Sequence, residues 1–302
     1  MNEVNSVREL QIVEAVPGTS LGQDAWRRLK RNRLAYACLW ALGGILLLCS
    51  GGALLSWAGI LPDPNATHLD RILAAPGDGY LLGSDALGRD VFARILFGGL
   101  VSIAVGVVAT LVSVIIGVTY GAVAGYVGGR CDAVMMRFVD ILYAMPFVIL
   151  VIVLMSLFGM NLFWLFIAIG AVEWLTMARI VRGQVMSLKK QEFIEAARSL
   201  GLGHGSILFR HLIPNCLGPV IVYTTLTVPS VMRLEAVLSF LGMGVQPPNS
   251  SWGTLIKEGA DRMTTSAGLL LFPAAAFALT LFCLNFLGDG LRDALDPKGS
   301  KD

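Results

Sequence analysis

The sequence has little charge for its length. Only 15% of its 302 residues are charged, whereas a soluble globular domain carries roughly 25%. Hydrophobic residues make up 55% of the chain and its mean hydropathy is +0.71, so there are too few polar side chains to cover a surface that meets water on all sides. The formal charge of +2 is too close to balance to indicate nucleic-acid binding. We therefore expect a protein that lies in membrane lipid and has no nucleic-acid partner.

Cysteine and histidine are scarce as well. The five cysteines stand one at a time within or beside apolar runs, which is typical neither of a disulfide framework nor of a CxxC metal site. The three histidines lie in separate polar stretches, so their nitrogens are too dispersed to form a metal centre. We expect the cysteines to be small packing residues, and we expect no metal and no cofactor.

The chain also lacks a nucleotide-binding motif. None of its six lysines follows a glycine, so the Gly-Lys-Ser/Thr of a phosphate-binding loop cannot be found in it. HExxH is absent too, and no histidine lies within the long apolar runs to act as a base in the membrane. We predict that the chain is not an enzyme and that another polypeptide hydrolyses any ATP.

Long uncharged runs, by contrast, are abundant. A helix rises about 1.5 Å per residue and the hydrocarbon core is about 30 Å thick, so roughly 20 uncharged residues suffice for a span. Five runs qualify: Leu34–Ile60, Ile95–Gly129, Ile141–Val172, Leu212–Met232 and Met263–Gly288. One helix over Phe138–Arg179 would be about 60 Å long, so we predict a break at Gly159-Met160-Asn161 that leaves Phe138–Phe158 and Leu162–Ile180. The predicted fold class is all-α, a polytopic bundle of six transmembrane helices.

The basic residues indicate how these spans are oriented. Seventeen lie in the N-terminal segment, after the second span, around the fourth-to-fifth connection and at the C-terminus, whereas the other face has five: Arg71, Arg89, Arg94, Lys257 and Arg262. Because basic residues concentrate in cytoplasmic loops, we expect a multi-pass protein of the cytoplasmic membrane with both termini inside. The expected parts are cytoplasmic tails at 1–33 and 291–302, a transmembrane domain at 34–290, outward loops at 61–98 and 238–262, and a cytoplasmic loop at 181–215.

Two acid–base pairs mark the end of the first outward loop. Asp85 with Arg89, and Asp90 with Arg94, are spaced i,i+4 in the order that favours a helix. We predict an interfacial helix over 84–98 that leads into the second span.

Small residues recur inside the second span. Gly117, Gly121 and Gly125 repeat at i+4, the small-xxx-small pattern of closely packed membrane helices. We predict close packing at these glycines, which fits a sliding contact between moving helices and a static contact equally well.

Two acidic residues lie inside predicted spans, where a charge is costly and needs a partner or water. Asp140 is three residues from Arg137, so we expect an interfacial pair between them. Glu173 lies about two turns from Arg179, whose long side chain can reach along the helix. We favour a structural role for both acids.

Arg233 and Glu235 fall at the outer end of the fifth predicted span. They follow Pro229, which we expect to interrupt the helix. Two interpretations remain open: the pair lines a wet translocation pathway and meets peptide termini, or it forms a solvated helix end.

The cytoplasmic loop contains a short amphipathic pattern. Phe193, Ala196, Ala197 and Leu200 follow i, i+3, i+4, i+7, which predicts one face of a helix around 192–200. The helix should stop at Gly201-Leu202-Gly203, where glycine adopts the left-handed cap geometry. Helices that bind lipid surfaces tend to be longer and to carry Lys and Arg on the polar face, whereas this polar face has acidic residues at 192 and 195. We favour docking on a soluble partner; the alternative is a helix packed on its own bundle.

These residues resemble the transmembrane subunits of bacterial ATP-binding cassette importers. The EAA motif of that family reads Glu-Ala-Ala, three residues, Gly, nine residues, then Ile-x-Leu-Pro, and its spacing is kept here by Glu195, Ala196, Ala197, Gly201 and Pro214. The sequence departs from it at His211, where Ile is usual, and at Ile213, where Leu is usual.

Four other segments resemble the peptide and nickel branch of the family, and most of all its oligopeptide permeases. They are residues 83–91 before the second span, 172–179 in the fourth, 240–253 before the sixth, and 288–297 at its exit. The similarity covers the chain from about residue 26 onward and occurs in the expected order.

The resemblance implies the transmembrane domain of a type I importer. In this family two related permease subunits form the pathway, two ATPase subunits dock on the coupling helices, and an external binding protein delivers peptide. Closure of the ATPases would move residues 192–200 and rock the bundle between inward-open and outward-open states. Residues Glu195, Ala196, Ala197 and Gly201 would then be the ATPase-coupling residues.

The implied substrate is an oligopeptide, and dipeptides, murein peptides and nickel remain alternatives within the same architecture. An ion-driven secondary transporter is an alternative from another class. Against it, the spans show no series of Asp, Glu or His for a proton relay, and no paired halves with internal symmetry are visible.

Overall fold

The computed structural model describes residues 21–77 and 79–295. Residues 1–20 and 296–302, which belong to the two predicted tails, lie outside the described residues. The described part is helical, with one isolated bridge between Ser84 and Asp90. Its elements are α1 (Leu21–Arg31), α2 (Arg33–Trp57), the 3-10 turn η1 (Leu69–Arg71), α3 (Val91–Val127), α4 (Gly129–Ala144), α5 (Phe147–Phe158), α6 (Leu162–Leu188), α7 (Glu192–Ser199), α8 (His204–Ser206), the π-helical turn η2 (Ile207–Leu212), α9 (Ile213–Asn215), α10 (Leu217–Phe240), α11 (Trp252–Ala260) and α12 (Gly268–Leu295).

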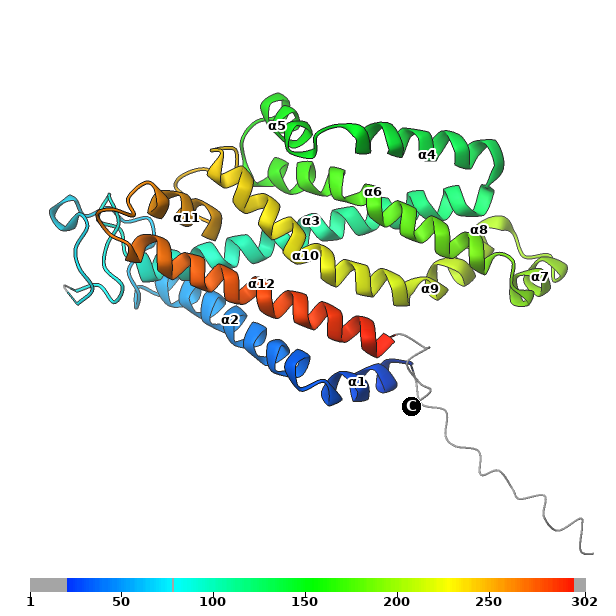
Figure 1. Cartoon of the computed structure of the whole chain (residues 1–302), viewed down its shortest axis with the longest axis horizontal. Helices are drawn as coiled ribbons and strands as arrows, with labels where there is room; N and C mark the ends of the chain where they lie inside the picture. Colours follow the sequence, from blue (N-terminus) through cyan, green and yellow to red (C-terminus); the bar gives the residue numbers. More distant parts are fainter. Residues whose placement is uncertain (1–20, 78, 296–302) are drawn as a thin grey trace, which may run out of the picture.

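Five long helices, α2, α3, α6, α10 and α12, form the body of the bundle (Figure 1). Each is long and apolar enough to cross a membrane, and a sixth span results if the bent pair of α4 and α5 is counted as one. Helix α7 projects from one end of the bundle, whereas α11 and the loop before α3 lie at the other end (Figure 1). The predicted all-α membrane bundle is confirmed.

The third predicted span, Phe138–Phe158, is wrong as a single straight helix. Helix α4 already begins at Gly129, and α4 and α5 meet at a bend of 92°. Pro146 is the physical reason, because the residue before a proline is driven out of the helical region. Met145 accordingly has an extended ψ of 141°.

The break predicted at residues 159–161 is confirmed. Helix α5 ends at Phe158, and Gly159 takes a φ of +99°, which glycine tolerates best. Asn161 then caps α6, since its Oδ1 accepts a hydrogen bond from the N–H of Trp164 at 3.0 Å. Helix α6 continues to Leu188, beyond the predicted end at Ile180.

The predicted interruption at Pro229 is wrong. Helix α10 runs through this proline, which is buried, and the helix as a whole packs on α3 and α12. Membrane helices tolerate a proline when their neighbours support the backbone. Tertiary packing therefore outweighs the local cost of the missing N–H.

Helix α1 lies in the segment predicted only as a tail. Its Leu29 is buried with Ala35 of α2 and Ala294 of α12. The helix therefore ties the start of the chain to the last turns of α12.

The predicted close packing at the glycines is confirmed, and the partner is α6. A Cβ on Gly117 would lie 2.6 Å from Cβ of Met177, and one on Gly125 would lie 2.7 Å from the carbonyl oxygen of Arg182. A Cβ on Gly121 would meet the carbonyl oxygen of Ala178. These distances leave no room for a side chain, so α3 and α6 touch backbone to backbone along this stripe.

The helix predicted over 84–98 is wrong for its first half, so the loop predicted to face outward ends at Asp90 and not at residue 98. Residues 83–90 form a turn, and α3 begins at Val91. Gly83 and Gly88 have φ values of +83° and +74°, which disfavour a helix here. Asp90 instead caps α3, since its Oδ1 accepts a hydrogen bond from the N–H of Ala93 at 3.0 Å.

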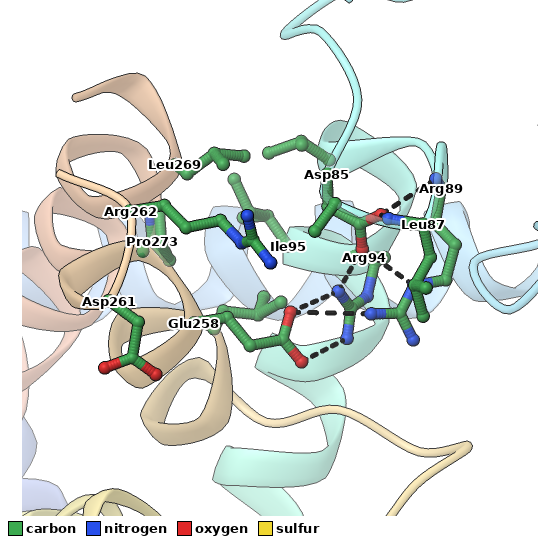
Figure 2. A pocket seen from close by; sticks show the side chains of 14 residues that line it. Asp85, Leu87, Arg89, Arg94, Ile95, Glu258, Asp261, Arg262, Leu269 and Pro273 are labelled. Atoms are coloured by element: carbon green, nitrogen blue, oxygen red, sulfur yellow. Dashed lines mark hydrogen bonds and ion pairs between the residues drawn. The ribbon is translucent and has the colours of Figure 1, made fainter. Parts of the chain in front are cut away.

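An ion cluster that is buried except at Glu258 joins this turn to α11, as Figure 2 shows. Arg94 is 2% exposed; its Nη1 lies 2.6 Å from Oε2 of Glu258 and also pairs with Asp85. The Nε of Arg89 donates to Oδ2 of Asp85 at 2.7 Å. The predicted Asp85–Arg89 pair is therefore present, but Arg94 pairs with Asp85 and Glu258 rather than with Asp90. We call Asp85, Arg89, Arg94 and Glu258 the outward ion cluster, because all four belong to the two predicted outward loops.

The cluster stabilises the ionised form of Asp85. Burial raises the pKa of this carboxyl, but hydrogen bonds from the N–H groups of Arg89 and Leu87, with the charges of Arg94 and Arg89, lower it by more. The pKa of Asp85 therefore lies below its usual value.

The glycine stripe predicts that Gly121→Ala destabilises the protein. The added methyl group must push α3 away from α6, and such overpacking costs about 1–3 kcal/mol. Gly183→Ala on α6 is the matched control, because its Cβ meets nothing within 4 Å, and it should gain up to about 1 kcal/mol from helix propensity. Thermal unfolding in detergent measures both; equal midpoints for the two variants would contradict the contact.

The outward ion cluster predicts a loss of stability in acid. A carboxyl whose folded pKa is depressed contributes stability that is complete above its unfolded pKa, about 3.9, and is lost as pH falls through the folded pKa. Asp85→Asn should cost about 3 kcal/mol at pH 7, the scale of a broken buried ion pair. It should then lose less stability than wild type between pH 7 and pH 3.

Thermal unfolding at the two pH values checks this expectation. Asp70→Asn is the control, because the Asp70 side chain is 74% exposed and its contact with Arg71 is long, at 3.6 Å. If acid lowers the midpoint of Asp85→Asn as much as that of wild type, the cluster is not the source of the effect.

Candidate functional site

The predicted helix around residues 192–200 is present as α7, at one end of the bundle (Figure 1). Its Ile194 and Ala197 are buried with Ile207, Leu208 and Leu212 of η2. The helix therefore rests on the segment that leads into α10, rather than standing free on a flexible loop.

The apolar face predicted for this helix is divided in two. Ala197 packs on the protein itself, whereas Phe193, Ala196 and Leu200 remain exposed, Leu200 to 82%. Glu195 is exposed next to them. Exposed apolar side chains beside an acidic one form a surface that a further protein can cover. One side of the helix therefore packs on the bundle, and the other side is exposed.

Gly201 ends α7 in the predicted left-handed conformation. Its φ is +76°, and the N–H groups of Gly201 and Leu202 donate to the carbonyl oxygens of Arg198 at 2.9 Å and Ala197 at 3.2 Å. A Cβ at Gly201 would meet nothing within 4 Å. Glycine is needed here for the backbone angle and not for space.

Two contacts tie the loop around α7 to the last turn of α3. The Nζ of Lys189 donates to the carbonyl oxygens of Gly125 at 2.8 Å and Tyr126 at 3.3 Å. The Oη of Tyr126 lies 2.7 Å from Nδ1 of His204. Sequence reasoning missed both contacts, although a lysine after an apolar helix is a usual partner for free carbonyls at a helix end.

The exit from the loop contains the two departures from the EAA motif. His211 belongs to η2 and Ile213 is the first residue of α9. The side chain of His211 is half-buried, and its carbonyl oxygen accepts a hydrogen bond from Nδ2 of Asn215 at 2.6 Å. Ile213 is likewise half-buried and packs against the cluster that holds α7. The two substitutions therefore lie inside a continuous helical connection.

The ionisable residues at membrane depth have other partners than predicted. Asp140 pairs with Arg179 of α6, whose Nη2 lies 2.8 Å from Oδ1, and not with Arg137. Asp132 of α4 also pairs with α6, since its Oδ2 accepts a hydrogen bond from Nη2 of Arg182 at 2.6 Å. Both pairs join α4 to α6 across long stretches of sequence, which local spacing does not show.

Arg233 and Glu235 point to different parts of the structure. Arg233 is exposed and lines a cavity of about 610 Å³ between α4, α6 and α10. Glu173 lines the same cavity, so its neighbour there is Arg233 rather than the predicted Arg179. The two predicted pathway residues therefore do not form one site.

Glu235 is completely buried among hydroxyl groups. Its Oε1 accepts hydrogen bonds from Ser239 at 2.6 Å and Ser251 at 2.7 Å, and Ser102 lies 3.5 Å from its Oε2. Ser102 Oγ also accepts a hydrogen bond from the N–H of Trp252 at 3.0 Å. The carboxyl group thus holds α3, α10 and α11 together. Ser239 is four residues from Glu235 on the same helix, but no helical spacing could have connected Ser102 and Ser251 to it.

Two family profiles match the sequence. Residues 117–301 match the family described as "Binding-protein-dependent transport system inner membrane component". Residues 20–76 match the "N-terminal TM domain of oligopeptide transport permease C".

Similar proteins carry related names. The oligopeptide transport system permease protein OppC of Haemophilus influenzae is 49% identical over 97% of this chain and 92% of its own length. OppC of Escherichia coli K12 is 50% identical over 94% of this chain and 93% of its own length. The dipeptide transport system permease protein DppC of Bacillus subtilis is 43% identical over 93% and 87%. The chain therefore belongs to the family of inner membrane components of binding-protein-dependent transport systems.

Proposed function

We propose that this chain is the permease subunit of an ATP-binding cassette importer that carries oligopeptides across the cytoplasmic membrane. The observation that carries the proposal is the identity of about half of all residues, over nearly the whole chain, with two permeases named for oligopeptide transport. The open apolar surface of α7 supports it, because an importer subunit needs a docking surface for its ATPase. Membership of this family disfavours the ion-driven transporter considered from the sequence.

In this proposal α7 transmits motion from separate ATPase subunits that hydrolyse the ATP. Glu195 and Ala196 meet the ATPase, Ala197 fixes the helix to η2, and Gly201 sets the turn behind it. Lys189 and His204 connect the same loop to α3. Because α7 is held on the bundle at several points, a push on it moves the bundle and not the loop alone.

We assign the proposed partners to the two ends and to one side of the bundle. Two ATPase subunits cover the α7 end, and an external binding protein meets the end with the outward ion cluster. A homologous second permease subunit faces α4, α6 and α10, since the exposed charge of Arg233 at membrane depth must meet protein or water rather than lipid. Both termini lie in the cytoplasm.

Dipeptides are the second candidate substrate. The Bacillus subtilis relative named for dipeptide transport is 43% identical to this chain, so the same architecture serves shorter peptides. Competition assays in a strain that lacks this permease, with peptides of two to six residues against a labelled tripeptide, separate the two. Inhibition by dipeptides alone would contradict the oligopeptide assignment.

The turn at Gly201 predicts that replacing this glycine uncouples ATP hydrolysis from peptide uptake. Gly201→Leu forces a side chain into a left-handed backbone conformation, which costs about 1–2 kcal/mol, and it should displace α7 from its ATPase. We expect the variant to insert normally, to lower peptide uptake at least tenfold and to leave ATP hydrolysis running. Glu195→Arg should act in the same direction by reversing a charge at the docking surface.

Gly203→Leu is the matched control for this turn. Gly203 also has no neighbour within 4 Å of a Cβ, but its φ is −66°, which any residue adopts. Uptake in reconstituted vesicles, measured with ATP hydrolysis, compares the variants. Normal uptake with both Gly201→Leu and Glu195→Arg would show that α7 is not the coupling helix.

The proposed orientation predicts where reporters become active. A green fluorescent protein after Asp302 should fluoresce in the cytoplasm, and alkaline phosphatase inserted after Gly77 should be active outside. Phosphatase activity from a fusion after Asp302 would overturn the six-span arrangement.

A further inference from the structure

The cavity between α4, α6 and α10 contains one charge of each sign. It is lined by Tyr143 of α4, by Glu173 and Thr176 of α6, and by Tyr223, Ser230 and Arg233 of α10, with apolar side chains around them. Its volume of about 610 Å³ falls within the range of small-molecule sites. It is therefore large enough for a short peptide.

Both charges lie well inside their helices. Glu173 follows the first residue of α6 by about 17 Å, and Arg233 precedes the last residue of α10 by about 10 Å, at 1.5 Å per residue. Ionisable groups at such depth are costly, and by default they mark a substrate or ion path.

The two charged groups remain available. In the described part of the chain, neither Glu173 nor Arg233 has an ion-pair partner within 4.0 Å, although each lies within the electrostatic reach of the other. The neighbouring Arg179, by contrast, is bound to Asp140 and stacks on Tyr143, 4.4 Å from its ring centre. The guanidinium of Arg179 is thus occupied, whereas Arg233 and Glu173 are open to a ligand.

We propose that this cavity is a transit site that binds the main-chain ends of a peptide, with Glu173 receiving the α-ammonium group and Arg233 the α-carboxylate. The inference rests on the proposed function, since only a peptide carrier meets such ligands.

The chemistry of the lining fits this class of ligand. A guanidinium binds a carboxylate through two parallel hydrogen bonds, and a carboxylate accepts well from an ammonium group. Peptides of different sequence share their main-chain ends, so a site for these ends accepts any side chain. An anionic lipid headgroup would use Arg233 but would leave Glu173 facing a like charge.

Paired charge variants and blocked peptides test the site in the complete importer in vesicles. Trialanine is supplied free, N-acetylated, C-amidated or blocked at both ends, and each variant rate is divided by the wild-type rate for the same peptide. The same binding protein serves wild type and variants, so this ratio cancels its own preference among the four peptides. Arg233→Gln should slow the two forms with a free carboxylate about tenfold and spare the amidated forms. Glu173→Gln should slow the two forms with a free ammonium group and spare the acetylated ones.

Arg137→Gln is the control, because it removes an exposed charge of α4 outside the cavity. Ratios that fall equally for all four peptides, or that do not fall, would overturn the site while leaving the importer intact. Absence of ATP-dependent uptake of trialanine by wild type would overturn the proposed function itself, and the site with it.

A second measurement does not depend on transport of blocked peptides. Ser230→Cys is placed in a Cys131→Ser background, since Ser230 lines the cavity and leaves both charged groups intact, and Cys131 is the exposed native cysteine of the described residues. Its reaction with a positively charged thiol reagent should slow at least threefold when millimolar trialanine is added to the assembled importer. An unchanged rate would count against peptide in this cavity.

Discussion

The backbone contact between α3 and α6 is the constraint on which the rest of the structure depends. Three glycines let the helices touch without side chains between them, and no other residue fits at those positions. On one flank of this pair, the loop with α7 is bound to the end of α3 by Lys189 and His204. On the other flank, α4 is joined to α6 by ion pairs. The exposed surface of α7 and the charged cavity are therefore both attached to the same pair of helices.

The spans were predictable because hydropathy is a property of consecutive residues. All five long helices, the break at Gly159 and the left-handed turn at Gly201 follow from local sequence. The bend at Pro146 was predictable by the same logic but was missed, because a run of apolar residues hides it. Pro229 shows the limit of local rules: the proline occurs within a continuous helix, since burial against α3 and α12 holds α10 together.

The ion pairs were less predictable, because the true partners are distant in sequence. The spacing of four residues correctly predicted the pair of Asp85 and Arg89. Arg94, however, pairs with Glu258, which lies 164 residues further along the chain. Asp140 likewise finds Arg179, 39 residues away. Only the tertiary arrangement brings such charges together, so the spacing of charges along one helix does not identify them.

Arg233 and Glu235 illustrate what helical geometry adds to a list of charges. Side chains two residues apart on a helix point in directions about 160° apart, so these two side chains face different surroundings. Glu235 faces serines of α3, α10 and α11 and is satisfied by them without a cation. Arg233 faces the cavity and has no such partner. One helix thus joins α3 and α11 on one side, and on the other side it presents a charge to the cavity that α4 and α6 also line.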